Sequence, residues 1–516
     1  MSYVDLDPDN LLQIIAEKDA FIAQLQEQLK LAMLYRFGRR ADTYVNPDQG
    51  CLFEASELDA CLSGERISEA PSEIIEVPAH ERTKSRGKRE PLPSCLPRED
   101  RIYELSPEEL LGPDGEVFEK MGEEISEQLD IIPAEVKVIR HIRYQYAVKL
   151  REELGVRIAP LPPQILPKTL AAPGLLAHMV QAKFEHHLPL YRQESIWADL
   201  GVEIPRNSMS RWTNDLGEKL QPLADRLLLA IKETGYLHAD ETSVTVIKDP
   251  HKKAEKPSHT GKMWVYLNEA IGAFYDYRHS REGKHPREIL QGFQGYLQVD
   301  GYSGYDRLYE DKIIQVGCMA HIRRKFTDVQ KLGGKKYKTP VADHVVERIQ
   351  RLYELESKMK KAGLNPSEIL KERQEKAKPI LEKLHQFLKE VRPKSPPKGK
   401  LGEALGYALN HWDVTLNYLL DGRLDIDNNA AERAIKPFAV GRKNWLFSHQ
   451  SHGAEASATL YSLVQSAKYH GLNVFRYLKA VFEAFPTAKT PEKLDALLPH
   501  RLAKTQPELK KSQEDG

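Results

Sequence analysis

The first 45 residues carry apolar side chains at helical spacing. These recur at alternating steps of three and four over about three heptads, which is typical of a coiled-coil seam. The seam positions are Leu11, Ile15, Ile22, Leu25, Leu29 and Ala32, with Lys18 interrupting them. Residues 1–45 are therefore predicted to form an N-terminal helix that self-associates. A single helix packed on its own protein is the alternative.

Farther along, the pattern changes from a helical period to alternation. Helical spacing over 161–232 follows a stretch that holds five prolines between Pro160 and Pro173. Alternating apolar and polar positions then predict an antiparallel meander of three strands, a short helix and two further strands. The strands are expected at 236–247, 263–268, 273–279, 295–299 and 313–319, and the helix at 286–292. Helical patterns resume over 323–410 and 411–484, so an α/β fold is predicted.

Two helices joined by a glycine turn lie within the first helical region. The stretch 190–201 ends in Gly201, which closes a helix, and a second helix begins after Pro205. Its first turns offer side chains that can contact a DNA groove: Arg206, Asn207, Ser208 and Arg211. This is the arrangement of a helix-turn-helix DNA-binding region. Helix pairs of this kind also occur inside protein cores, so both interpretations stay open at this point.

Composition divides the chain further. Residues 46–90 have the prolines, glycines and basic residues of a linker. Strand-like apolar positions, among them Val136, Val138 and Ile142, predict a small β-containing unit. The predicted organisation is a helix at 1–45, a linker at 46–90, a small unit at 91–160, a helical region at 161–232, the first part of a catalytic domain at 233–322, a helical insertion at 323–410, the second part of that domain at 411–484, and a C-terminal element and tail at 485–516.

The 75 basic and 75 acidic side chains of the 516 residues give a formal net charge of zero. They are unevenly distributed. Residues 1–80 hold 6 Lys/Arg against 15 Asp/Glu, whereas residues 323–400 hold 22 against 10. The basic segment favours contact with nucleic acid and the acidic segment disfavours it. A solvated helix face is the alternative for the basic segment.

Cysteine usage and hydropathy exclude other classes of protein. The four cysteines are scattered, with no C-x₂-C pair: Cys51, Cys61, Cys95 and Cys318. This pattern argues against a disulfide framework and favours a reducing cytoplasm. The acidic N-terminus lacks the features of a signal peptide, and the chain has no run of 18 apolar residues that would predict a membrane span. No membrane partner is expected.

The stretch 425–437 is predicted to start a helix. Its aspartate and asparagines can cap free N–H groups, and Pro437 argues for an early end or a kink. Glu432 falls in an early turn. A basic and aromatic run follows, whose side chains can hold phosphates or stack on a base: Lys436, Arg442, Lys443 and Trp445. The alternatives are a surface helix on which Glu432 pairs with Lys436 and a tryptophan in the core.

Two aspartates upstream change the interpretation of Glu432. Asp240 lies within the first predicted strand and Asp300 follows the fourth, so all three acids can converge at the edge of one mixed sheet. Three carboxylates in one pocket repel each other and need a cation to stay ionised. Oxygen ligands select Mg²⁺ or Mn²⁺, and two such ions about 4 Å apart can activate the attacking and stabilise the leaving oxygen at phosphorus. The alternative is that the aspartates only cap strand ends.

Three neighbouring side chains are expected to be structural. His238 lies two residues before Asp240 and therefore on the same face of the strand, where it is predicted to be a hydrogen-bonded core histidine rather than part of a metal site. Cys318 and His321 supply two metal ligands at most, so they are predicted to pack at a strand–helix junction.

Several motifs closely resemble those of the IS66-family transposases. They are LHADET at 237–242, QVDGY at 298–302, GCMAHIRRKF at 317–326, and DNNAAERAI at 427–435 followed by GRKNW at 441–445. The resemblance runs from about Leu25 to about Leu498. It implies an RNase H-like mixed-sheet catalytic domain with a large helical insertion, preceded by helical DNA-binding and coiled-coil segments. It also implies a DDE triad, matched here to Asp240, Asp300 and Glu432.

One region departs from the family pattern. Members usually carry a small zinc-binding domain, and residues 121–130 and 138–143 are similar to its body. The paired cysteines are missing, because residues 112–115 and 147–150 stand where they would be expected. Zinc is therefore not expected in this chain.

Together, the motifs predict a DNA transposase of a bacterial insertion sequence. It would cleave strands at the element ends and transfer them into target DNA, with two Mg²⁺ or Mn²⁺ ions. The expected partners are both DNAs, further copies of this chain and other element-encoded proteins, in the bacterial cytoplasm at the nucleoid. One alternative is an inactive DNA-binding remnant of such an element. The other is an RNase H-like nuclease that cuts without joining.

Overall fold

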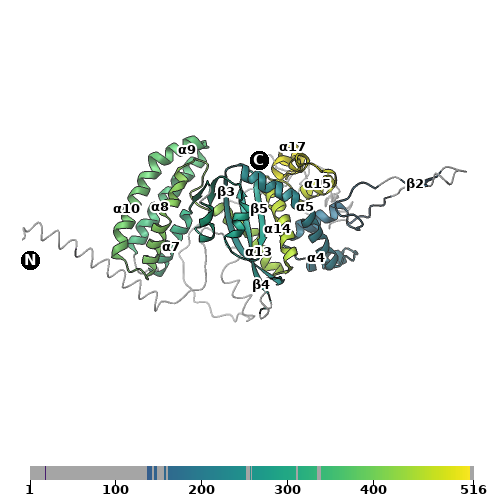
Figure 1. Cartoon of the computed structure of the whole chain (residues 1–516), viewed down its shortest axis with the longest axis horizontal. Coiled ribbons are helices and arrows are strands. Elements are labelled where there is room, and N and C mark those ends of the chain that lie inside the picture. Colours follow the sequence, from purple (N-terminus) through teal and green to yellow (C-terminus); the bar gives the residue numbers. More distant parts are fainter. Residues whose placement is uncertain are drawn as a thin grey trace, which may run out of the picture. The chain divides into compact units, whose positions relative to one another are not determined.

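The computed structural model describes most of the chain from residue 136 onward (Figure 1). The described residues are 18, 136–141, 145–147, 156–158, 161–251, 256, 258–309, 312–333 and 339–511. The predicted coiled coil and linker lie outside them, apart from Lys18. From Val138 on, the described residues belong to one compact unit. No helix among them is long and apolar enough to cross a membrane.

A six-stranded mixed sheet lies at the core of this unit. Its strands are β3 (Tyr236–Lys248), β4 (His259–Asn268), β5 (Gly272–Arg278), β6 (Gly295–Gln298), β7 (Ile313–Val316) and β8 (Ser448–Gln450). Their order is β5-β4-β3-β6-β7, with β8 beside the end of β3. The first three strands are antiparallel, and the last three run parallel to β3. The five predicted strands are thus present, and β8 was missed because three residues show no period.

One edge of the sheet is covered by α14 (Ser451–Tyr469). An edge strand exposes N–H groups that need partners. Here Ser462 Oγ accepts from the N–H of Tyr275 on β5 (2.8 Å), and Ser466 Oγ accepts from the N–H of Ala273 (2.9 Å). Two serines in a buried helix thus take the place of a neighbouring strand.

Three helices precede the sheet, as the helical spacing predicts. They are α3 (Pro173–Phe184), α4 (Leu190–Asp199) and α5 (Arg206–Glu233). Gly201 follows α4 with φ +77°, the left-handed conformation that ends a helix without strain. The buried face of α5 joins the same hydrophobic core as the sheet through Leu216, Leu220, Leu223, Leu227 and Ile231.

The helices after β7 build a second hydrophobic core. They are α7 (Met319–Gly333), α8 (Pro340–Lys361), α9 (Pro366–Glu372), a π-helical turn (Arg373–Ala377), α10 (Lys378–Val391), α11 (Lys400–Asn410) and α12 (Trp412–Leu416). The longer of these helices lie side by side in Figure 1. Tyr236 of β3 and Val316 of β7 belong to the same cluster, so this helical segment is packed against the sheet.

A buried arginine fastens the loop that leads out of this segment. Arg373 pairs with Glu356 through two hydrogen bonds of 2.9 and 2.8 Å. Its guanidinium also donates to the backbone carbonyls of Tyr418, Asp421 and Leu424. Since a buried charge is costly without partners, these contacts hold the backbone just before residue 425 in one place.

Helix α13 (Asn429–Trp445) begins where the sequence predicts, but it does not end early. It continues through Pro437 for two further turns, so the early end is wrong, while the alternative of a kink at Pro437 stays a prediction. A proline inside a helix removes one hydrogen bond and costs about 3 kcal/mol. Burial of Ala434, Ile435 and Phe438 in the core offsets that cost.

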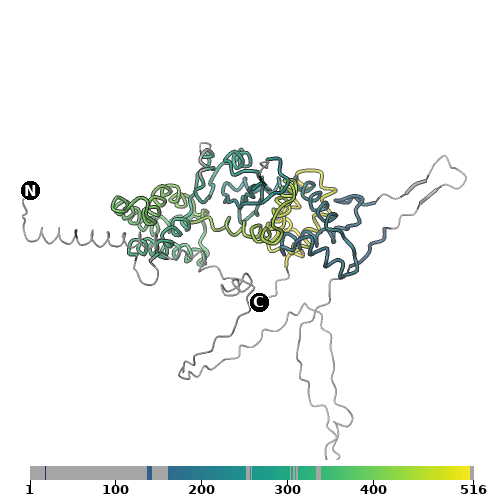
Figure 2. The backbone as a smooth tube through the Cα atoms, turned by 90° about the horizontal axis from the view of Figure 1, so that it is seen from below, coloured from purple at the N-terminus to yellow at the C-terminus, as the bar shows by residue number. Residues whose placement is uncertain are grey.

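The remaining helices are short. They are α6 (Lys284–Ile289), α15 (Val474–Ala484), α16 (Pro491–Ala496) and α17 (Pro499–Thr505). The C-terminal helices, in yellow, lie against α3, α5 and α14 (Figure 2).

The small unit predicted at 91–160 is described only in part. Two short strands, β1 (Gln145–Ala147) and β2 (Val156–Ile158), pair antiparallel. Val136 and Val138, expected to be core positions of a strand, lie outside these strands and are 41% and 89% exposed. That expectation is wrong, because alternation reports on burial only where another layer covers the strand. Ile142 lies outside the described residues.

Candidate active site

Asp240 and Asp300 lie side by side because of the register between two parallel strands. His238 of β3 is aligned with Gln298 of β6, and each aspartate follows two residues later. On the other side of β6, the N–H of Val299 donates to the carbonyl of Val316 on β7 (3.1 Å). The register between β3 and β6 therefore brings Asp240 and Asp300 to the same end of this strand pair.

The chain turns sharply after Asp300. Gly301 has φ +91°, and a Cβ there would clash with the ring of His411. Asp300 Oδ1 accepts from the N–H of Tyr302 (3.1 Å), and its backbone carbonyl accepts from the hydroxyl of Tyr407 on α11 (3.0 Å). Both ends of the residue are therefore held, one by the turn and one by the helical segment.

Asp240 is buried and lies among negative charges that include the third acid. Burial raises this pKa, and the negative charges of Glu241, Asp300 and Glu432 raise it further, to about 7, although the N–H of Glu241 donates to its Oδ1 (2.8 Å). Glu432 lies in the first turn of α13, which packs on β3 and β4. The three acids predicted from sequence thus act on one another electrostatically.

Glu432 has basic neighbours from α7. Its Oε1 accepts a hydrogen bond from Arg324 (3.3 Å) and lies 3.9 Å from His321 Nε2. The pairing with Lys436 weighed above is not among the ion pairs of the described residues. Burial and the charge of Arg324 lower the pKa of His321, while Asp300 and Glu432 act in the opposite direction. His321 therefore faces the acids. The sequence predicted its packing at the strand–helix junction but did not predict that it lies near Glu432.

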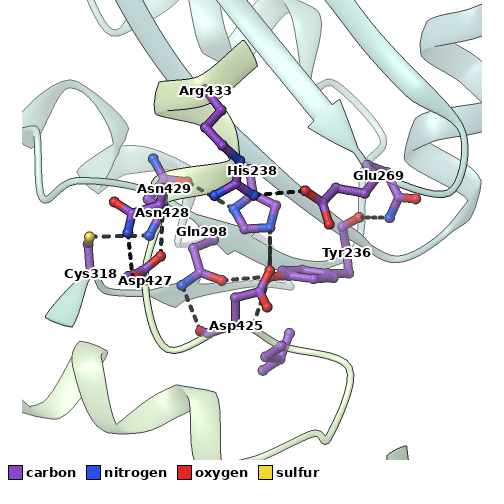
Figure 3. Close-up of polar contacts among 12 residues, drawn as sticks. Tyr236, His238, Glu269, Gln298, Cys318, Asp425, Asp427, Asn428, Asn429 and Arg433 are labelled. Carbon is purple, nitrogen blue, oxygen red and sulfur yellow. Dashed lines mark hydrogen bonds and ion pairs between the residues drawn. The ribbon is translucent and has the colours of Figure 1, made fainter. Parts of the chain in front are cut away.

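A buried polar network surrounds His238, which lies two residues before Asp240 on β3 (Figure 3). The Gln298 amide donates to the carbonyls of Asp425 (2.8 Å) and Gly317 (3.2 Å), so its oxygen must accept. Tyr236 donates its single proton to that oxygen (2.6 Å) and accepts from the N–H of Asp425 (3.0 Å). His238 Nε2, 2.8 Å from the Tyr236 hydroxyl and 3.3 Å from Asp425 Oδ2, is left as a donor.

The other side of His238 faces Asn428. The amide nitrogen of Asn428 donates to the carbonyl of Ala239 (2.9 Å), so its oxygen accepts from His238 Nδ1 (3.0 Å). Both ring nitrogens therefore lie beside hydrogen-bond partners, and Asp425 Oδ2 lies 3.3 Å from Nε2. Partial burial opposes ionisation of Asp425, but the hydrogen bond and charge of His238 outweigh it and lower the pKa of that carboxyl. The predicted core role of His238 is confirmed.

Asn428 is the N-cap residue of α13, yet its side chain does not cap the helix. It binds the sheet instead, and the N–H of Asn428 donates to Cys318 Sγ (3.2 Å). Asp427 caps in its place by accepting from the N–H of Asn429 (3.0 Å), and Tyr353 of α8 donates to it (2.7 Å). Burial raises the pKa of Cys318 to about 12, so this thiol is neutral and structural, as predicted.

Asp240, Asp300 and Glu432 are the candidates for holding a divalent cation. The donor set of Asp240, Asp300 and Glu432 is all oxygen, and the raised pKa of Asp240 is the response expected where a positive charge would be favoured. In the present conformation no group of three or more His, Cys, Asp or Glu side chains among the described residues is placed to hold a metal ion. Glu432 is paired with Arg324 instead.

The candidate DNA-contacting residues at the start of α5 lie at the surface. Arg206, Asn207 and Arg211 are exposed and Ser208 is half-buried. The N–H of Arg206 donates to Glu194 of α4 (2.8 Å), which ties the two helices together at the turn. The side chains are presented outward, as contact with a groove requires, while the opposite face of α5 is in the core.

The candidate DNA-contacting residues on α13 divide into two groups. Lys436 and Lys443 are exposed. Arg442 is held by the protein, because its guanidinium donates to Thr242 Oγ1 (3.2 Å) and to the carbonyl of Ser243 on β3. Trp445 is half-buried and packs edge-on against Phe438, with ring centroids 5.4 Å apart. Trp445 is thus closer to the core alternative than to an open stacking surface.

Models of known protein families match most of the chain. A family model described as "Transposase IS66 family" matches residues 168–456, and the "IS66 C-terminal element" matches 462–500. Two further models match 113–147 ("zinc-finger binding domain of transposase IS66") and 24–101 ("Transposase C of IS166 homeodomain"). These matches confirm the resemblance seen in the sequence motifs.

Similar full-length proteins occur in Sinorhizobium fredii (strain NBRC 101917 / NGR234). The uncharacterized protein y4jD is 33% identical over 426 residues, which cover 79% of this chain and 81% of the relative. The uncharacterized protein y4qI is 31% identical over 500 residues, 93% of this chain and 88% of the relative. The similarity therefore covers at least 79% of this chain and at least 81% of each relative.

The zinc-finger match corrects one expectation. It places residues 113–147 in a zinc-binding class of domain, which counts against the prediction that the chain uses no zinc. The matched residues hold one histidine, His141, and no cysteine. The prediction relied on the missing cysteine pairs. The family model also matches the body of the domain, so the chain resembles this class of domain even without those ligands.

Proposed function

Because the chain belongs to the IS66 transposase family, we propose that it is a DDE transposase that cleaves the ends of an insertion sequence and joins them to target DNA. The observation that carries this proposal is the register of β3 and β6, which brings Asp240 beside Asp300. Glu432 supports it through its effect on the pKa of Asp240. These are the three residues that the motifs single out.

The strand topology supports an RNase H-like catalytic domain. Three antiparallel strands are followed by two strands parallel to the first, in the order β5-β4-β3-β6-β7. Such a sheet puts the end of β6 next to the first residues of β3, and each aspartate follows two residues after the last aligned pair. Residues 319–426 interrupt the domain before α13 returns to the sheet with Glu432.

Each acid has a role that its surroundings support. Asp240 and Asp300, on neighbouring strands, would hold a divalent cation between them, and Glu432 would complete the set after leaving Arg324. When bound, two Mg²⁺ ions supply activation of the attacking oxygen and neutralisation of charge on the leaving one. The protein itself positions the DNA and the acids, and it excludes other geometries.

The bond changes are the same in both steps. In cleavage, a water oxygen forms a bond to phosphorus, the bond from phosphorus to the 3′-oxygen breaks, and the 3′-hydroxyl is released after taking a proton. In joining, that 3′-hydroxyl attacks a phosphodiester of the target, and the target's own 3′-oxygen leaves. Cleavage loses one phosphoester bond to water. Joining breaks one phosphoester bond and forms another, and the proton of the attacking 3′-hydroxyl is passed on to the leaving 3′-oxygen.

The surface of α13 supports DNA binding along the helix. At 100° per residue, Lys436 and Lys443 lie within about 40° of Glu432 around the helix axis. Both are exposed. A DNA strand entering the site along this face would meet a lysine about 6 Å and another about 16 Å from the level of Glu432. The start of α5, with Arg206 and Arg211, would contact the element end elsewhere.

The test is Glu432→Gln, which keeps shape and deletes charge. We expect cleavage of a labelled duplex carrying the terminal inverted repeat to fall by several orders of magnitude, with binding of that duplex retained. Glu347→Gln, on an exposed glutamate of α8, is the matched control and should cleave at the wild-type rate. Near-wild-type cleavage and joining by Glu432→Gln would refute the assignment.

The same labelled duplex distinguishes the alternatives. Joined products from the wild-type protein support a transposase. Nicked ends without joining would indicate a nuclease, and binding without cleavage an inactive remnant. Self-association and dependence on other element-encoded proteins remain part of the proposal, and the first would be tested by light scattering with and without residues 1–45.

A further inference from the structure

The turn that ends α13 exposes two apolar side chains in succession. Leu446 is 64% exposed and Phe447 is 46% exposed. Single exposed apolar residues are common on protein surfaces and need no explanation. Two adjacent ones at the end of the helix that carries Glu432 are less easily dismissed, particularly since the preceding Trp445 is packed against the protein.

The backbone at Leu446 is strained. Its φ is +65° and its ψ is −47°, in a region that a residue with a Cβ rarely adopts. The N–H of Phe447 donates to the carbonyl of Trp445 (2.8 Å), which closes a γ-turn of the rare, positive-φ form around Leu446. Glycine would fit this turn without strain. Strain of this kind persists where the surrounding structure imposes it, and such positions cluster at functional sites.

Cations surround the turn. Lys443 is exposed one turn before it on α13. On the other side, β8 begins at Ser448 and pairs with the end of β3, where Lys248 is aligned with Gln450. Lys248 is also exposed. Apolar side chains between exposed cations match nucleic acid, whose phosphates are anionic and whose bases are apolar on their faces.

The turn lies at a defined distance from the acids. Thirteen helical residues separate Glu432 from Trp445, a rise of about 20 Å. Along β3, Val246 pairs with Ser448 and lies six residues beyond Asp240, again about 20 Å. At 3.4 Å per base pair, this distance corresponds to about six base pairs of duplex.

We propose that Leu446 and Phe447 form a wedge that inserts between bases of the element-end DNA about six base pairs from the cleaved phosphodiester. The inference rests on the proposed function, since it places the DNA along α13 with its cleaved phosphate at Glu432. The rigid γ-turn holds both side chains outward, and Lys443 and Lys248 hold the flanking phosphates. Insertion unstacks one base step and fixes the register of the DNA relative to the acids.

The test uses 2-aminopurine, whose fluorescence rises when it is unstacked. Duplexes of the terminal inverted repeat carry it singly at each position from about four to about eight base pairs from the cut. With the wild-type protein, fluorescence should rise several-fold at one or two adjacent positions only. The double variant Leu446→Ala/Phe447→Ala should abolish that rise and weaken end binding about tenfold, the loss expected for one base-stacking contact.

A control and two contrary outcomes complete the experiment. Leu229→Ala removes a comparably exposed leucine on α5 and should leave the fluorescence unchanged. An undiminished rise in the double variant would overturn the wedge, and so would the lack of a response at every position in a wild-type complex that still cleaves the duplex. Failure of the wild-type protein to bind or cleave it would instead refute the proposed function and the wedge with it.

Discussion

His238 on β3 donates a hydrogen bond from Nδ1 to the side-chain oxygen of Asn428, across 3.0 Å, at the start of α13. This contact joins the strand that carries Asp240 to the helix that carries Glu432. Asp240 lies two positions after His238, and Glu432 lies four positions after Asn428. The His238–Asn428 contact therefore constrains the distance between Asp240 and Glu432. The side chain of Asn428 binds the sheet and does not cap its own helix.

We therefore expect Asn428→Ala to reduce cleavage by more than the accompanying loss of stability would explain. The change removes a hydrogen-bond partner of a buried imidazole and frees the first turn of α13, so cleavage should fall about 10² to 10³-fold. End binding should remain within a few-fold of wild type, because the side chains proposed to contact DNA lie elsewhere. Single-turnover cleavage at saturating protein is the measurement.

Asn473→Ala is the matched control for that change. Asn473 is also an N-cap, and its side chain accepts from the N–H of Arg476 on α15. Losing it should cost about 1 kcal/mol of stability and leave cleavage intact. Equal losses of cleavage in the two variants would show that Asn428 acts only as a general stabiliser.

The raised pKa of Asp240 predicts a stability that depends on pH. A carboxyl whose pKa is about 7 when folded and near 4 when unfolded binds more protons in the folded state between these values. Stability in a chelating buffer should therefore fall as pH rises from about 4 to about 7. Asp240→Asn should be more stable than wild type at pH 8, by on the order of 2 kcal/mol, and the two should converge near pH 4.

Thermal unfolding at both pH values measures this difference. Adding Mg²⁺ at pH 8 should stabilise the wild type and leave Asp240→Asn nearly unchanged, since the cation offsets the repulsion. Asp328→Asn, at an exposed ion pair on α7, should give no stabilisation at either pH. A wild type whose stability does not change between pH 5 and 8 would contradict the prediction.

The start of α5 is predicted to contact the element ends. Arg206→Ala and Arg211→Ala should each weaken binding of the terminal inverted repeat by about 1–3 kcal/mol, if the side chain reads a base. Gel-shift titration at fixed salt is the measurement. Arg287→Ala, on an exposed arginine of α6, is the control, and an equal effect there would point to general loss of charge.

The lysines of α13 are predicted to contact phosphates rather than bases. Lys436→Ala combined with Lys443→Ala should reduce the slope of log affinity against log salt by about 2, because each contact releases about one counterion. Binding should weaken equally for end and unrelated sequences. Lys479→Ala on α15 is an exposed control. A slope unchanged in the double variant would remove α13 from the DNA path.

Leu446→Gly is expected to stabilise the protein. Glycine adopts the positive φ of this γ-turn at no steric cost, so the free energy of unfolding should rise by about 1 kcal/mol, while Leu446→Ala should give no gain. Urea titration measures both. Leu420→Gly, at an exposed leucine with φ −82°, should instead lose stability. Destabilisation by Leu446→Gly would show that the turn is not strained.

Much of the fold was predictable from local pattern. Alternation located β3 to β7 to within a few residues, and Gly201 marked the end of α4. The errors arose where burial overrode local preference. Pro437 did not end α13, because the helix is held by its buried face, and Val136 and Val138 are exposed despite their alternation.

The candidate site was predictable in its members but not in its connections. Motifs and element order alone single out Asp240, Asp300 and Glu432. Nothing local to the sequence linked Arg324 to Glu432, 108 positions apart, or Tyr236 to Gln298. Such pairs are set by strand register and helix packing, which depend on contacts between residues far apart in the chain.

By itself, the sequence determined where the strands and most helices begin, the transposase family to which the chain belongs, and the three acids that the resemblance to this family singles out, because periodicity and motif residues are local properties. Only the tertiary structure decided the rest. It placed Asp240 near Asp300, surrounded His238 with hydrogen-bond partners, turned Asn428 from a cap into a link with the sheet, and exposed Leu446 and Phe447 while burying much of Trp445. Each of these depends on which distant groups surround a side chain, and that is settled only when the whole chain has packed.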